Sequence, residues 1–495
     1  MKEYEILDWV EYAVHDYNTA ETLVNQNGYS DIIIYHYHQS LEKIFKGILL
    51  KFQDTIPKTH FLDKLLSDIS NYYENINEIS DEVLYIHKFL PLLRYPSGEK
   101  ITNSDALQVK KIFHEILSFL KLHFTELYVF EKKLKILMLN YEFPPLGGGA
   151  SPVSYEIAKG LVGIGPSVTV VTMGYKDLPK YEEIDGIKIY RVKCLRSKKE
   201  ICHPWEQLSY LLSAKKFLKK HLKNNKYDIN HTHFIIPTGY LALWLKKKYK
   251  LNYIITSHGS DVLGYNKRFA KLYPFLIKPW KKYIKEAKAV TTPSQFLQNE
   301  IKKITTNGNF IVITNGIDPD KFKPMKKENS ILIVARLFVN KGIQDILDAL
   351  KDIDLKDWKV DIVGDGPYKD FLINKCHENG LDEKVTFHGW IDNKSDKMKE
   401  FYGKASLFIS ASYFENLSIV LLEALASGCH VIASNVGGNP EILEIDRLFD
   451  KGNVKELKSK ILENLMGNKN IPNKLNKKFL SSNVIVEFNR LFQWN

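Results

Sequence analysis

Residues 134–149 read Leu-Lys-Ile-Leu-Met-Leu-Asn-Tyr-Glu-Phe-Pro-Pro-Leu-Gly-Gly-Gly, and this stretch decides the fold. Its first residues form an almost unbroken apolar run, which is typical of a strand buried in a parallel sheet. Gly147, Gly148 and Gly149 follow, and a helix is expected from about Ser151. Glycines between a strand and a helix let the backbone approach a ligand, and the helix N-terminus favours an anion. The stretch therefore predicts an α/β domain with an anion-binding loop, although a simple flexible turn remains the alternative.

Downstream of this stretch, short β-rich runs alternate with helical stretches in two series. Such alternation predicts parallel, doubly wound sheets. We expect two Rossmann-like domains, 133–322 and 323–482, with ligands bound in the cleft at the carboxyl ends of the strands. The last apolar stretch, 483–495, is expected to cross back to the first domain as a helix. The expected strands are 134–140, 167–172, 187–192, 228–233, 253–257, 289–292, 310–314, 330–334, 358–363, 384–388, 407–409 and 430–433.

Upstream, residues 1–128 show the helical period of 3.6 and no strand-like alternation. They predict an all-α bundle of about five helices. The expected fold class is therefore α/β, with two Rossmann-like domains preceded by a helical bundle. The expected helices are centred on residues 6–23, 41–48, 62–69, 80–93 and 104–124.

The two parts of the chain differ in charge. Residues 1–130 contain 12 Lys and Arg against 19 Asp and Glu, a net charge of −7. The remainder contains 58 against 39, a net charge of +19. A basic body suits an anionic ligand such as a nucleotide, or an anionic membrane or nucleic acid surface. A lysine-rich solvated surface is the alternative interpretation.

Two cations and two carboxylates mark the second series of strands. Arg336 ends its first strand, and Lys341 lies five residues later at the start of a helix. A guanidinium fork and an ammonium at this position suit a diphosphate, because a lone cation at a helix N-terminus is unfavourable. Glu415 lies in a later loop, and Glu423 is expected about two turns into the helix that follows. These carboxylates can accept hydrogen bonds from a sugar and a ribose, whereas solvated charges are the alternative.

Other loops add polar groups at strand ends. The backbone amides from Asn416 to Ile419 precede the same helix and can cradle a phosphate. His258, within Thr256-Ser-His-Gly-Ser-Asp261, can hydrogen-bond a substrate hydroxyl or move a proton. His231 and His233 form a His-x-His pair, but no carboxylate cluster accompanies them, so we expect no metal.

Taken together, these motifs resemble a family 4 glycosyltransferase with the GT-B fold. The resemblance covers residues 134–495 in the family's order and includes Asn315-Gly-Ile-Asp318 and Gly364-Asp-Gly-Pro367. It implies transfer of a sugar from a nucleotide diphosphate sugar as donor substrate, with retention of anomeric configuration and without cofactor or metal. It also implies that Arg336 and Lys341 hold the diphosphate and stabilise the leaving group.

The same resemblance assigns roles to the remaining residues. Glu415 is expected to bind donor sugar hydroxyls, and His258 to lie near the reactive face of the sugar. The strand end at Trp390 is expected to pack against the base, and Glu423 to bind the ribose. The implied catalytic residues are His258, Arg336, Lys341 and Glu415. The implied donor-binding residues are Gly147, Gly148, Gly149, Gly364, Trp390, Asn416, Leu417, Ser418 and Glu423.

Residues 1–125 resemble a HEPN domain. The resemblance rests on four short motifs, namely Trp9–Asp16, His38–Lys46, Lys58-Thr-His60 and Arg94-Tyr-Pro96. Many HEPN proteins are RNases with an Arg-x(4–6)-His motif, but no His follows Arg94 at that spacing. This difference and the net charge of −7 argue against a nucleic acid partner. We expect a module for self-association, protein binding or regulation.

Two functions remain open. The first is a hexosyltransferase of polysaccharide biosynthesis that acts on a glycan or lipid-linked acceptor. The second is a non-catalytic nucleotide-sugar sensor that regulates the HEPN-like domain. An epimerase or phosphorylase on the same fold is less favoured.

The sequence favours a cytoplasmic protein. It has four Cys, a charged start and no apolar run of 18 residues. Residues 263–280 carry Phe, Leu, Tyr and Trp among Lys and Arg, which is compatible with peripheral contact at the inner face of a membrane. A core helix with a solvated lysine face is the alternative, and it is the more favoured one.

Overall fold

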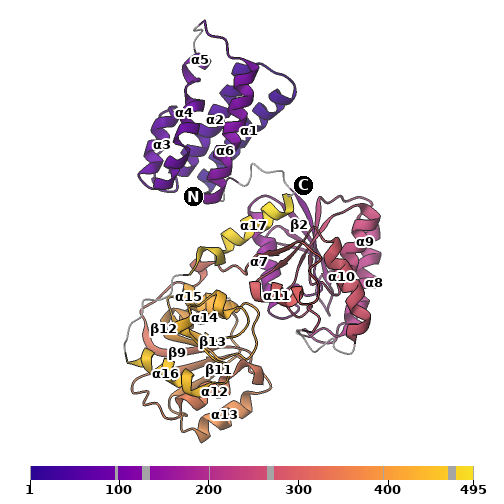
Figure 1. The fold of residues 1–495 in the computed structure, drawn as a ribbon, viewed down its shortest axis with the longest axis vertical. Coiled ribbons are helices and arrows are strands. Elements are labelled where there is room, and N and C mark those ends of the chain that lie inside the picture. The colour runs from indigo at the N-terminus through magenta and orange to yellow at the C-terminus, as the bar shows by residue number, and fades with distance from the viewer. Residues whose placement is uncertain are drawn as a thin grey trace. The chain divides into compact units, whose positions relative to one another are not determined.

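The chain is described by a computed structural model over residues 2–94, 98–124, 127, 134–199, 201–264, 272–393, 395–466 and 475–493. It divides into a helical unit, residues 1–134 with the loop 163–166, and an α/β unit, residues 135–162 and 167–495 (Figure 1). The expected boundary at 128–133 lies outside the described residues. No helix in the described ranges is long and apolar enough to cross a lipid bilayer.

Over its described residues, the helical unit has six α-helices and one 3₁₀ helix. In α2 (Ser30–Leu49), Ile34, Tyr37, Leu41 and Phe45 recur every three or four residues and are fully buried. This helix contacts α1, α3 and α6, so its apolar side chains form the centre of the core. The other elements are α1 (Lys2–Asn25), α3 (Leu62–Ser70), η1 (Glu74–Ile79), α4 (Ser80–His87), α5 (Leu90–Arg94) and α6 (Asn103–His123).

The prediction of one continuous helix over residues 80–93 is wrong. The structure has two helices there, α4 and α5. Pro91 gives the physical reason, because it has no backbone N–H and its ring would collide with the carbonyl group of His87 in a continuous helix. The other expected helices are present. Of the HEPN-like motif at Arg94-Tyr-Pro96, Tyr95 and Pro96 lie outside the described residues.

The first sheet of the α/β unit has the strand order β3-β4-β2-β1-β5-β6-β7-β8 over the described residues. Neighbouring strands are parallel, except that β3 and β4 are antiparallel. The predicted parallel alternation is thus confirmed. The strands are β1 (Lys135–Leu139), β2 (Ser167–Met173), β3 (Tyr181–Ile184), β4 (Ile187–Val192), β5 (Ile229–His233), β6 (Tyr253–Thr256), β7 (Ala289–Thr292) and β8 (Phe310–Val312).

The strand β3 was not expected from the sequence. It pairs with β4 through a two-residue turn at Asp185 and Gly186, whose φ angles are +50° and +73°. Asp-Gly favours this type of hairpin turn because both residues tolerate a positive φ. The dipeptide was therefore a usable signal, whereas a search for buried apolar runs misses β3 because the strand is largely exposed.

The second sheet is parallel throughout its described strands and has the order β11-β10-β9-β12-β13-β14. Its last strand, β14, is only two residues long and was not expected. We call the parts around the first and second sheets the first half and the second half. The strands of the second half are β9 (Glu328–Val334), β10 (Lys359–Val363), β11 (Val385–Gly389), β12 (Ala405–Ser410), β13 (His430–Ser434) and β14 (Leu448–Phe449).

Helices cover both sheets and the last helix returns to the first half (Figure 1). In α17 (Ser481–Gln493), Ile485 packs so closely on α7 (Ala150–Gly163) that a Cβ on Gly160 would lie 2.4 Å from its Cγ1. The rings of Phe488 and Phe492 lie 5.2 and 5.1 Å from that of His231. The remaining α-helices are α8 (Pro204–His221), α9 (Gly239–Tyr249), α10 (Tyr273–Glu286), α11 (Gln295–Lys302), α12 (Ile343–Leu350), α13 (Lys369–Glu378), α14 (Asp396–Lys404), α15 (Ile419–Ala426) and α16 (Val454–Leu465).

Candidate active site

The polar groups singled out from the sequence lie at the carboxyl ends of the parallel strands. In each half, these ends form one edge of the sheet, and this edge is where doubly wound sheets bind ligands. The topology therefore collects residues that are distant in sequence. The residues that follow a strand at this edge are Gly147–Gly149 after β1, His258 after β6, Arg336 after β9, Gly364 after β10, Trp390 after β11 and Glu415 after β12.

Lys341 and Glu415 form an ion pair at this edge. The Lys341 Nζ lies 2.5 Å from the Glu415 Oε1, although 74 residues separate them. Their side chains are only 22% and 16% exposed. Gly342, with φ +65°, follows Lys341 and lies against the Ala411 carbonyl oxygen, 1.9 Å from where a Cβ would stand. The backbone thus holds a cation and a carboxylate in fixed positions, which suits a ligand that carries both phosphate and hydroxyl groups.

Arg336 offers a second cation at the same edge. Its side chain is exposed, and its guanidinium carbon lies 5.4 Å from the ring centroid of Phe338. An aromatic neighbour supports the guanidinium plane and leaves the N–H donors at its rim available. The residue can therefore donate hydrogen bonds to a phosphate.

The loop that carries Glu415 packs tightly against the loop after β13. Gly437 has φ +58°, and a Cβ there would lie 1.8 Å from the Glu415 carbonyl oxygen. The N–H of Gly438 donates to the Asn416 carbonyl oxygen at 2.7 Å. The two glycines therefore fix the backbone on which the expected phosphate-binding amides lie. Leu417 and Ser418 are both buried.

Asn416 links the two halves through its side chain. Its Oδ1 accepts a hydrogen bond from the Ser294 hydroxyl at 2.8 Å, and its Nδ2 donates to the His258 carbonyl oxygen at 3.4 Å. The resemblance implied that the backbone N–H of Asn416 binds phosphate. The side-chain contacts do not prevent this, because they use different atoms of the residue. The side chain therefore orients the loops at the carboxyl edges of the two halves toward each other.

Glu441 is a positioning residue that was not singled out from the sequence. Its two carboxylate oxygens accept hydrogen bonds from the backbone N–H groups of Gln295 and Phe296, each at 2.9 Å. These N–H groups belong to the first turn of α11 in the first half. Glu441, in the second half, therefore places a negative charge at the N-terminus of that helix. The signal in the sequence was the run from Gly437 to Glu441, soon after β13.

His258 is held in one orientation by its neighbours. Its Nε2 lies 2.9 Å from the Nδ1 of His233, and the ring planes differ by 10°. The Asp261 Oδ1 accepts hydrogen bonds from the N–H groups of His258 and Gly259 at 3.1 and 3.0 Å. Burial lowers the pKa of His258 to about 4. The imidazole is therefore neutral at pH 7 and can exchange hydrogen bonds with a hydroxyl group, but it adds no positive charge.

His231 and His233 are fully buried on β5. The Nε2 of His231 lies 2.7 Å from the Thr256 hydroxyl, and burial lowers its pKa to about 3. Within the part of the chain that the structure describes, no group of three or more His, Cys, Asp or Glu side chains is arranged to hold a metal ion. The His-x-His pair belongs to the packing beneath His258.

Glu423 is deeply buried on α15. The sequence predicted a helix start near Leu417, but the helix begins at Ile419, so Glu423 is its fifth residue and lies two residues closer to its start than expected. Its carboxylate accepts hydrogen bonds from the Tyr402 hydroxyl at 2.7 Å and the Asn393 amide at 3.1 Å. Burial raises its pKa to about 7. A ribose hydroxyl that binds this carboxylate would have to share it with Tyr402 and Asn393.

The raised pKa of Glu423 predicts a pH-dependent stability. The group favours folding fully below its ordinary pKa of 4.5, and that contribution is lost as the pH rises toward about 7. We expect Glu423→Gln to be more stable than the wild type at pH 8, by up to about 3 kcal/mol, and to match it near pH 4.5. Calorimetry of the donor-free full chain across this range checks the result, and parallel curves for the two proteins would contradict it.

The glycine loop after β1 has one packed glycine and two open ones. Gly147 has φ +99°, and a Cβ there would lie 2.6 Å from the Glu142 Cβ. At Gly148 and Gly149, an added Cβ would have no such neighbour within 4 Å. Backbone at these two positions is therefore open to close approach by a ligand. The N–H of Gly147 donates to the Lys199 carbonyl oxygen at 2.9 Å, which ties the loop to the segment before α8.

Gly364 and Trp390 follow adjacent strands. Gly364 has φ +140°, and a Cβ there would lie 1.8 Å from the Ala335 carbonyl oxygen. Its N–H donates to the Gly389 carbonyl oxygen at 2.8 Å, directly before Trp390. The Trp390 side chain is 73% exposed at the end of β11. An exposed indole at the carboxyl edge is available for stacking on a planar base.

Two hollows are candidate binding sites. One of about 440 Å³ lies at the carboxyl ends of β12, β13 and β14. It is lined by Phe296, Tyr413, Phe414, Glu415, Asn435, Val436, Gly437, Asp450 and Lys451. Its wall includes Glu415, so it adjoins the ion pair with Lys341.

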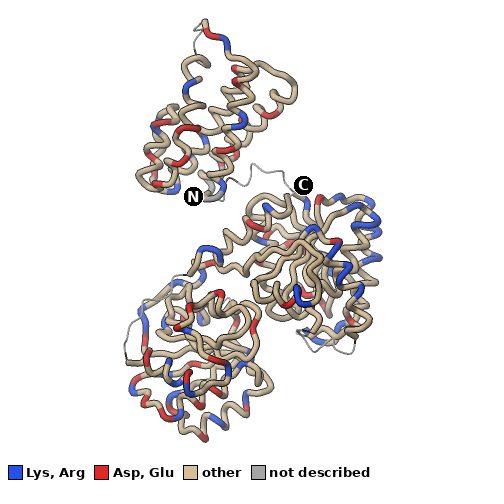
Figure 2. The backbone as a smooth tube through the Cα atoms, viewed as in Figure 1, with Lys and Arg blue, Asp and Glu red and all other residues tan. Residues whose placement is uncertain are grey.

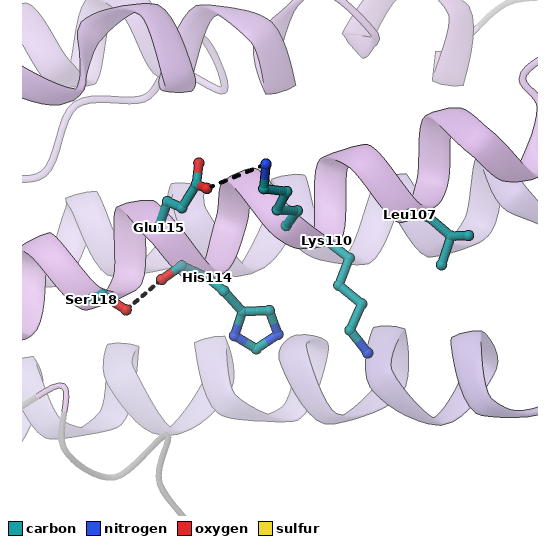
Figure 3. Close-up of a pocket in the computed structure, with 6 residues that line it drawn as sticks. Leu107, Lys110, His114, Glu115 and Ser118 are labelled. Carbon is teal, nitrogen blue, oxygen red and sulfur yellow. Dashed lines mark hydrogen bonds and ion pairs between the residues drawn. The ribbon is translucent and has the colours of Figure 1, made fainter. Parts of the chain in front are cut away.

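The other hollow, of about 690 Å³, lies along α6 in the helical unit (Figure 3). Its polar groups already have partners: Lys110 and His114 contact Glu21 at 2.8 and 3.0 Å, and the Ser118 hydroxyl donates to the His114 carbonyl oxygen. The chemistry therefore favours the carboxyl edge of the α/β unit.

Comparisons with protein families match all three parts of the chain. Residues 147–321 match the model "Glycosyltransferase Family 4", and residues 316–479 match "Glycosyl transferases group 1". Residues 6–123 match the model "HEPN domain".

Comparisons with curated proteins find glycosyltransferases. The chain is 32% identical to an uncharacterized glycosyltransferase of Methanocaldococcus jannaschii over 63% of its own length and 83% of the relative. It is 27% identical to the alpha-monoglucosyldiacylglycerol synthase of Streptococcus pneumoniae over 63% of its own length and 73% of that enzyme.

Solved structures share the fold of the α/β unit. The sucrose-phosphate synthase of Thermosynechococcus elongatus gives a TM-score of 0.57 at 20% identity, covering 73% of this chain and 95% of that one. The HepE protein of Anabaena in complex with UDP gives a TM-score of 0.55 at 19% identity, covering 72% and 96%. These similarities confirm the two-sheet architecture.

Proposed function

Since the chain belongs to the glycosyltransferases of GT-B type and carries an N-terminal HEPN domain, we propose that it transfers a sugar, with retention of anomeric configuration, from a nucleotide diphosphate sugar to a glycan or lipid-linked acceptor. The observation that carries this proposal is the Lys341–Glu415 pair at the carboxyl edge of the second sheet. The pair offers a cation for phosphate and a carboxylate for sugar hydroxyls at one place.

In the proposed reaction, the bond between the sugar C1 and the diphosphate oxygen breaks, the oxygen of the acceptor hydroxyl bonds to C1, and the proton of that hydroxyl passes to the departing diphosphate. Negative charge develops on the departing phosphate, where Lys341 and Arg336 stabilise it. Glu415 accepts hydrogen bonds from the donor sugar. His258 binds a hydroxyl group of the donor near C1. Its ring is neutral at pH 7, because burial lowers its pKa to about 4.

The roles of the other donor-binding residues are proposed from their positions at the carboxyl edge of the sheets. Trp390 stacks on the base, Glu423 contacts the ribose, and the amides of residues 416–418 hold phosphate. The open backbone at Gly148 and Gly149 approaches the diphosphate or the acceptor. The proposed roles use no metal ion or cofactor.

Similar proteins guide the choice of ligands to test. The HepE protein was solved with UDP and with UDP-glucose, so we propose a UDP-sugar as the first donor to test. The Streptococcus pneumoniae relative is named as a glucosyldiacylglycerol synthase, which supports an amphiphilic acceptor. We further propose that the protein works in the cytoplasm in polysaccharide or glycolipid synthesis, and that the HEPN domain binds a second copy or a protein partner.

The test is donor turnover by the purified full chain. UDP-glucose, GDP-mannose and ADP-glucose are each incubated without acceptor, and released nucleotide and sugar are measured by mass spectrometry and NMR. We expect slow hydrolysis of one donor, and the first anomer released has the configuration of the donor. Release of the opposite anomer would contradict retention. Binding in calorimetry without any turnover would favour the alternative function, a nucleotide-sugar sensor that regulates the HEPN domain.

A further inference from the structure

We propose that α8, together with Leu195 and Ile201 before it, docks the protein on an anionic lipid surface and thereby presents an amphiphilic acceptor to the active site. The α8 surface comprises Leu195, Ile201, Trp205, Leu208 and Leu212 with Lys216, Lys219, Lys220 and Lys223. The presentation of an acceptor depends on the proposed transfer reaction, whereas the docking to lipid does not.

The apolar part of the α8 surface is unusually exposed. Leu195, Trp205 and Leu212 are 65%, 61% and 65% exposed, and Leu208 and Ile201 are also exposed. The spacing of Trp205, Leu208 and Leu212 puts them on one face of α8. Gln207, Tyr210, Ala214 and Leu218 occupy the opposite face and are buried against the sheet. Five large apolar side chains within 18 residues are thus exposed, three of them on one face of α8, which marks an interaction surface.

The charged part of the α8 surface continues the same face. Lys216 and Lys219 follow Leu212 at helical spacing, Lys223 lies just beyond the end of α8, and all three are exposed. Residues 201–285 contain 17 Lys and Arg against three Asp and Glu. Figure 2 shows the basic segments of α8, α9 and α10 along the outside of the first half. The carboxylate of α8, Glu206, is buried. The helix is therefore apolar toward its start and cationic toward its end.

Ser197 and His203, which precede α8, are bound to Glu206 in its first turn. The Glu206 carboxylate accepts hydrogen bonds from the N–H and hydroxyl of Ser197 and from the N–H of His203, each at 2.7 Å. The ring of His203 stacks on that of Trp205 with centroids 4.5 Å apart. These contacts tie Ser197 and His203 to the first turn of α8, which displays Trp205.

The α8 surface adjoins the glycine loop of the active site. The Lys199 carbonyl oxygen accepts the hydrogen bond from the Gly147 N–H at 2.9 Å. The Arg196 guanidinium donates to the Lys199 carbonyl oxygen at 2.9 Å and to the Tyr141 carbonyl oxygen at 3.4 Å. The apolar end of the surface therefore lies beside the loop that is open to a ligand. An acceptor anchored in a bilayer at α8 would meet the active site at this edge.

The composition of the surface favours lipid over other occupants. Exposed Leu and Trp with flanking lysines match the apolar and anionic layers of a bilayer surface. Protein interfaces are depleted in lysine, and nucleic acid offers no partner for five aliphatic and indole groups in one patch. A second copy would bring like charges together.

The stretch 263–280, considered from the sequence for membrane contact, fits less well. The structure describes 263, 264 and 272–280 of it, whereas 265–271 lie outside the described residues. Trp280 is fully buried and donates its indole N–H to the Asp261 carbonyl oxygen at 2.9 Å. Trp280 therefore belongs to the core, and Phe275 is the exposed aromatic residue of α10.

The test is co-sedimentation of the full chain with vesicles. One set is phosphatidylcholine alone, and the other contains about 30% phosphatidylglycerol; both are run at low and at high NaCl concentration, about 50 and 500 mM. We expect at least about tenfold more protein on the anionic vesicles, with most of it released at high salt. We expect the triple variant W205S/L208S/L212S, and separately K216E/K219E/K223E, to lose at least about tenfold in binding.

A matched variant, F371S/I445S/M466S, removes three exposed apolar side chains from the second half and should bind as the wild type does. Donor hydrolysis without acceptor should be unchanged in all three variants, which shows that they fold and separates docking from catalysis. Unchanged vesicle binding by W205S/L208S/L212S would overturn the proposal. Loss of a dimer in that variant, without vesicle binding by the wild type, would assign the surface to a second copy instead. Vesicle binding without donor turnover by the wild type would leave docking standing and refute the acceptor role.

Discussion

Replacing Lys341 by alanine is expected to lower the rate of sugar transfer or donor hydrolysis by about 10²- to 10³-fold. The ammonium group is proposed to stabilise the charge that develops on the departing diphosphate. In the wild type, this ammonium lies 2.5 Å from the Glu415 carboxylate. Without it, the negative charge of Glu415 near the phosphates is no longer balanced by Lys341. We therefore expect the affinity for UDP to fall as well. Steady-state kinetics and calorimetry on the full chain measure the two effects separately.

The control for this variant is Lys351→Ala, which removes an exposed lysine from the end of α12 in the same half. It should transfer at the wild-type rate. A double-mutant cycle with Glu415→Gln then tests whether the two residues act as a unit. We expect the double variant to be less impaired than the product of the single effects, because each single change removes one member of the ion pair and leaves the other. A rate for Lys341→Ala within about threefold of the wild type would contradict the proposed site.

Most of the architecture could be predicted because buried parallel strands leave long apolar runs in the sequence. β1 and β2 are examples, since almost all their residues are buried. The exposed strand β3 has no such run, and only the turn at Asp185 and Gly186 indicated it. The break before α5 was also predictable, because Pro91 forbids a continuous helix. Both errors arose where local backbone chemistry outweighed hydrophobic periodicity.

The positions of candidate site residues along the chain could be predicted, but their contacts could not. Strand ends placed Arg336, Lys341 and Glu415 at one edge of a sheet. That Lys341 and Glu415 form a pair depends on β9 and β12 being neighbours, which the order of strands in the sequence does not reveal. The contact between His233 and His258 likewise depends on the pairing of β5 with β6.

Contacts between the two halves were the least predictable. Asn416 with Ser294, and Glu441 with the start of α11, join residues 122 or more apart. Neither residue type is unusual in a loop, and although the run from Gly437 to Glu441 marks a loop after β13, it does not show which residues Glu441 contacts. The exposed apolar face of α8 was missed for a related reason. Helical periodicity identifies which residues share a face, but only the packed structure shows that the face with Gln207 and Tyr210 is the buried one.

Replacing Gly364 by alanine is expected to destabilise the second half by about 3–5 kcal/mol. Its φ of +140° lies in a region that only glycine adopts readily, and a Cβ there would lie 1.8 Å from the Ala335 carbonyl oxygen. Either the ends of β9 and β10 separate or the turn rearranges. Urea unfolding of the full chain, followed by circular dichroism and intrinsic fluorescence, measures the shift in the transition.

Gly380→Ala is the matched control, because Gly380 also has a positive φ, +67°, but no atom within 4 Å of a Cβ position. Its cost should be only the backbone strain, about 1 kcal/mol. Similar transitions for the two variants would contradict the packing role assigned to Gly364. If Gly364→Ala is then stable but no longer binds UDP, the glycine is needed for close approach of the donor. If it unfolds early and the folded remainder binds UDP normally, its function is to seat the strand ends that carry Arg336 and Trp390, and the donor contact implied by the family resemblance is indirect.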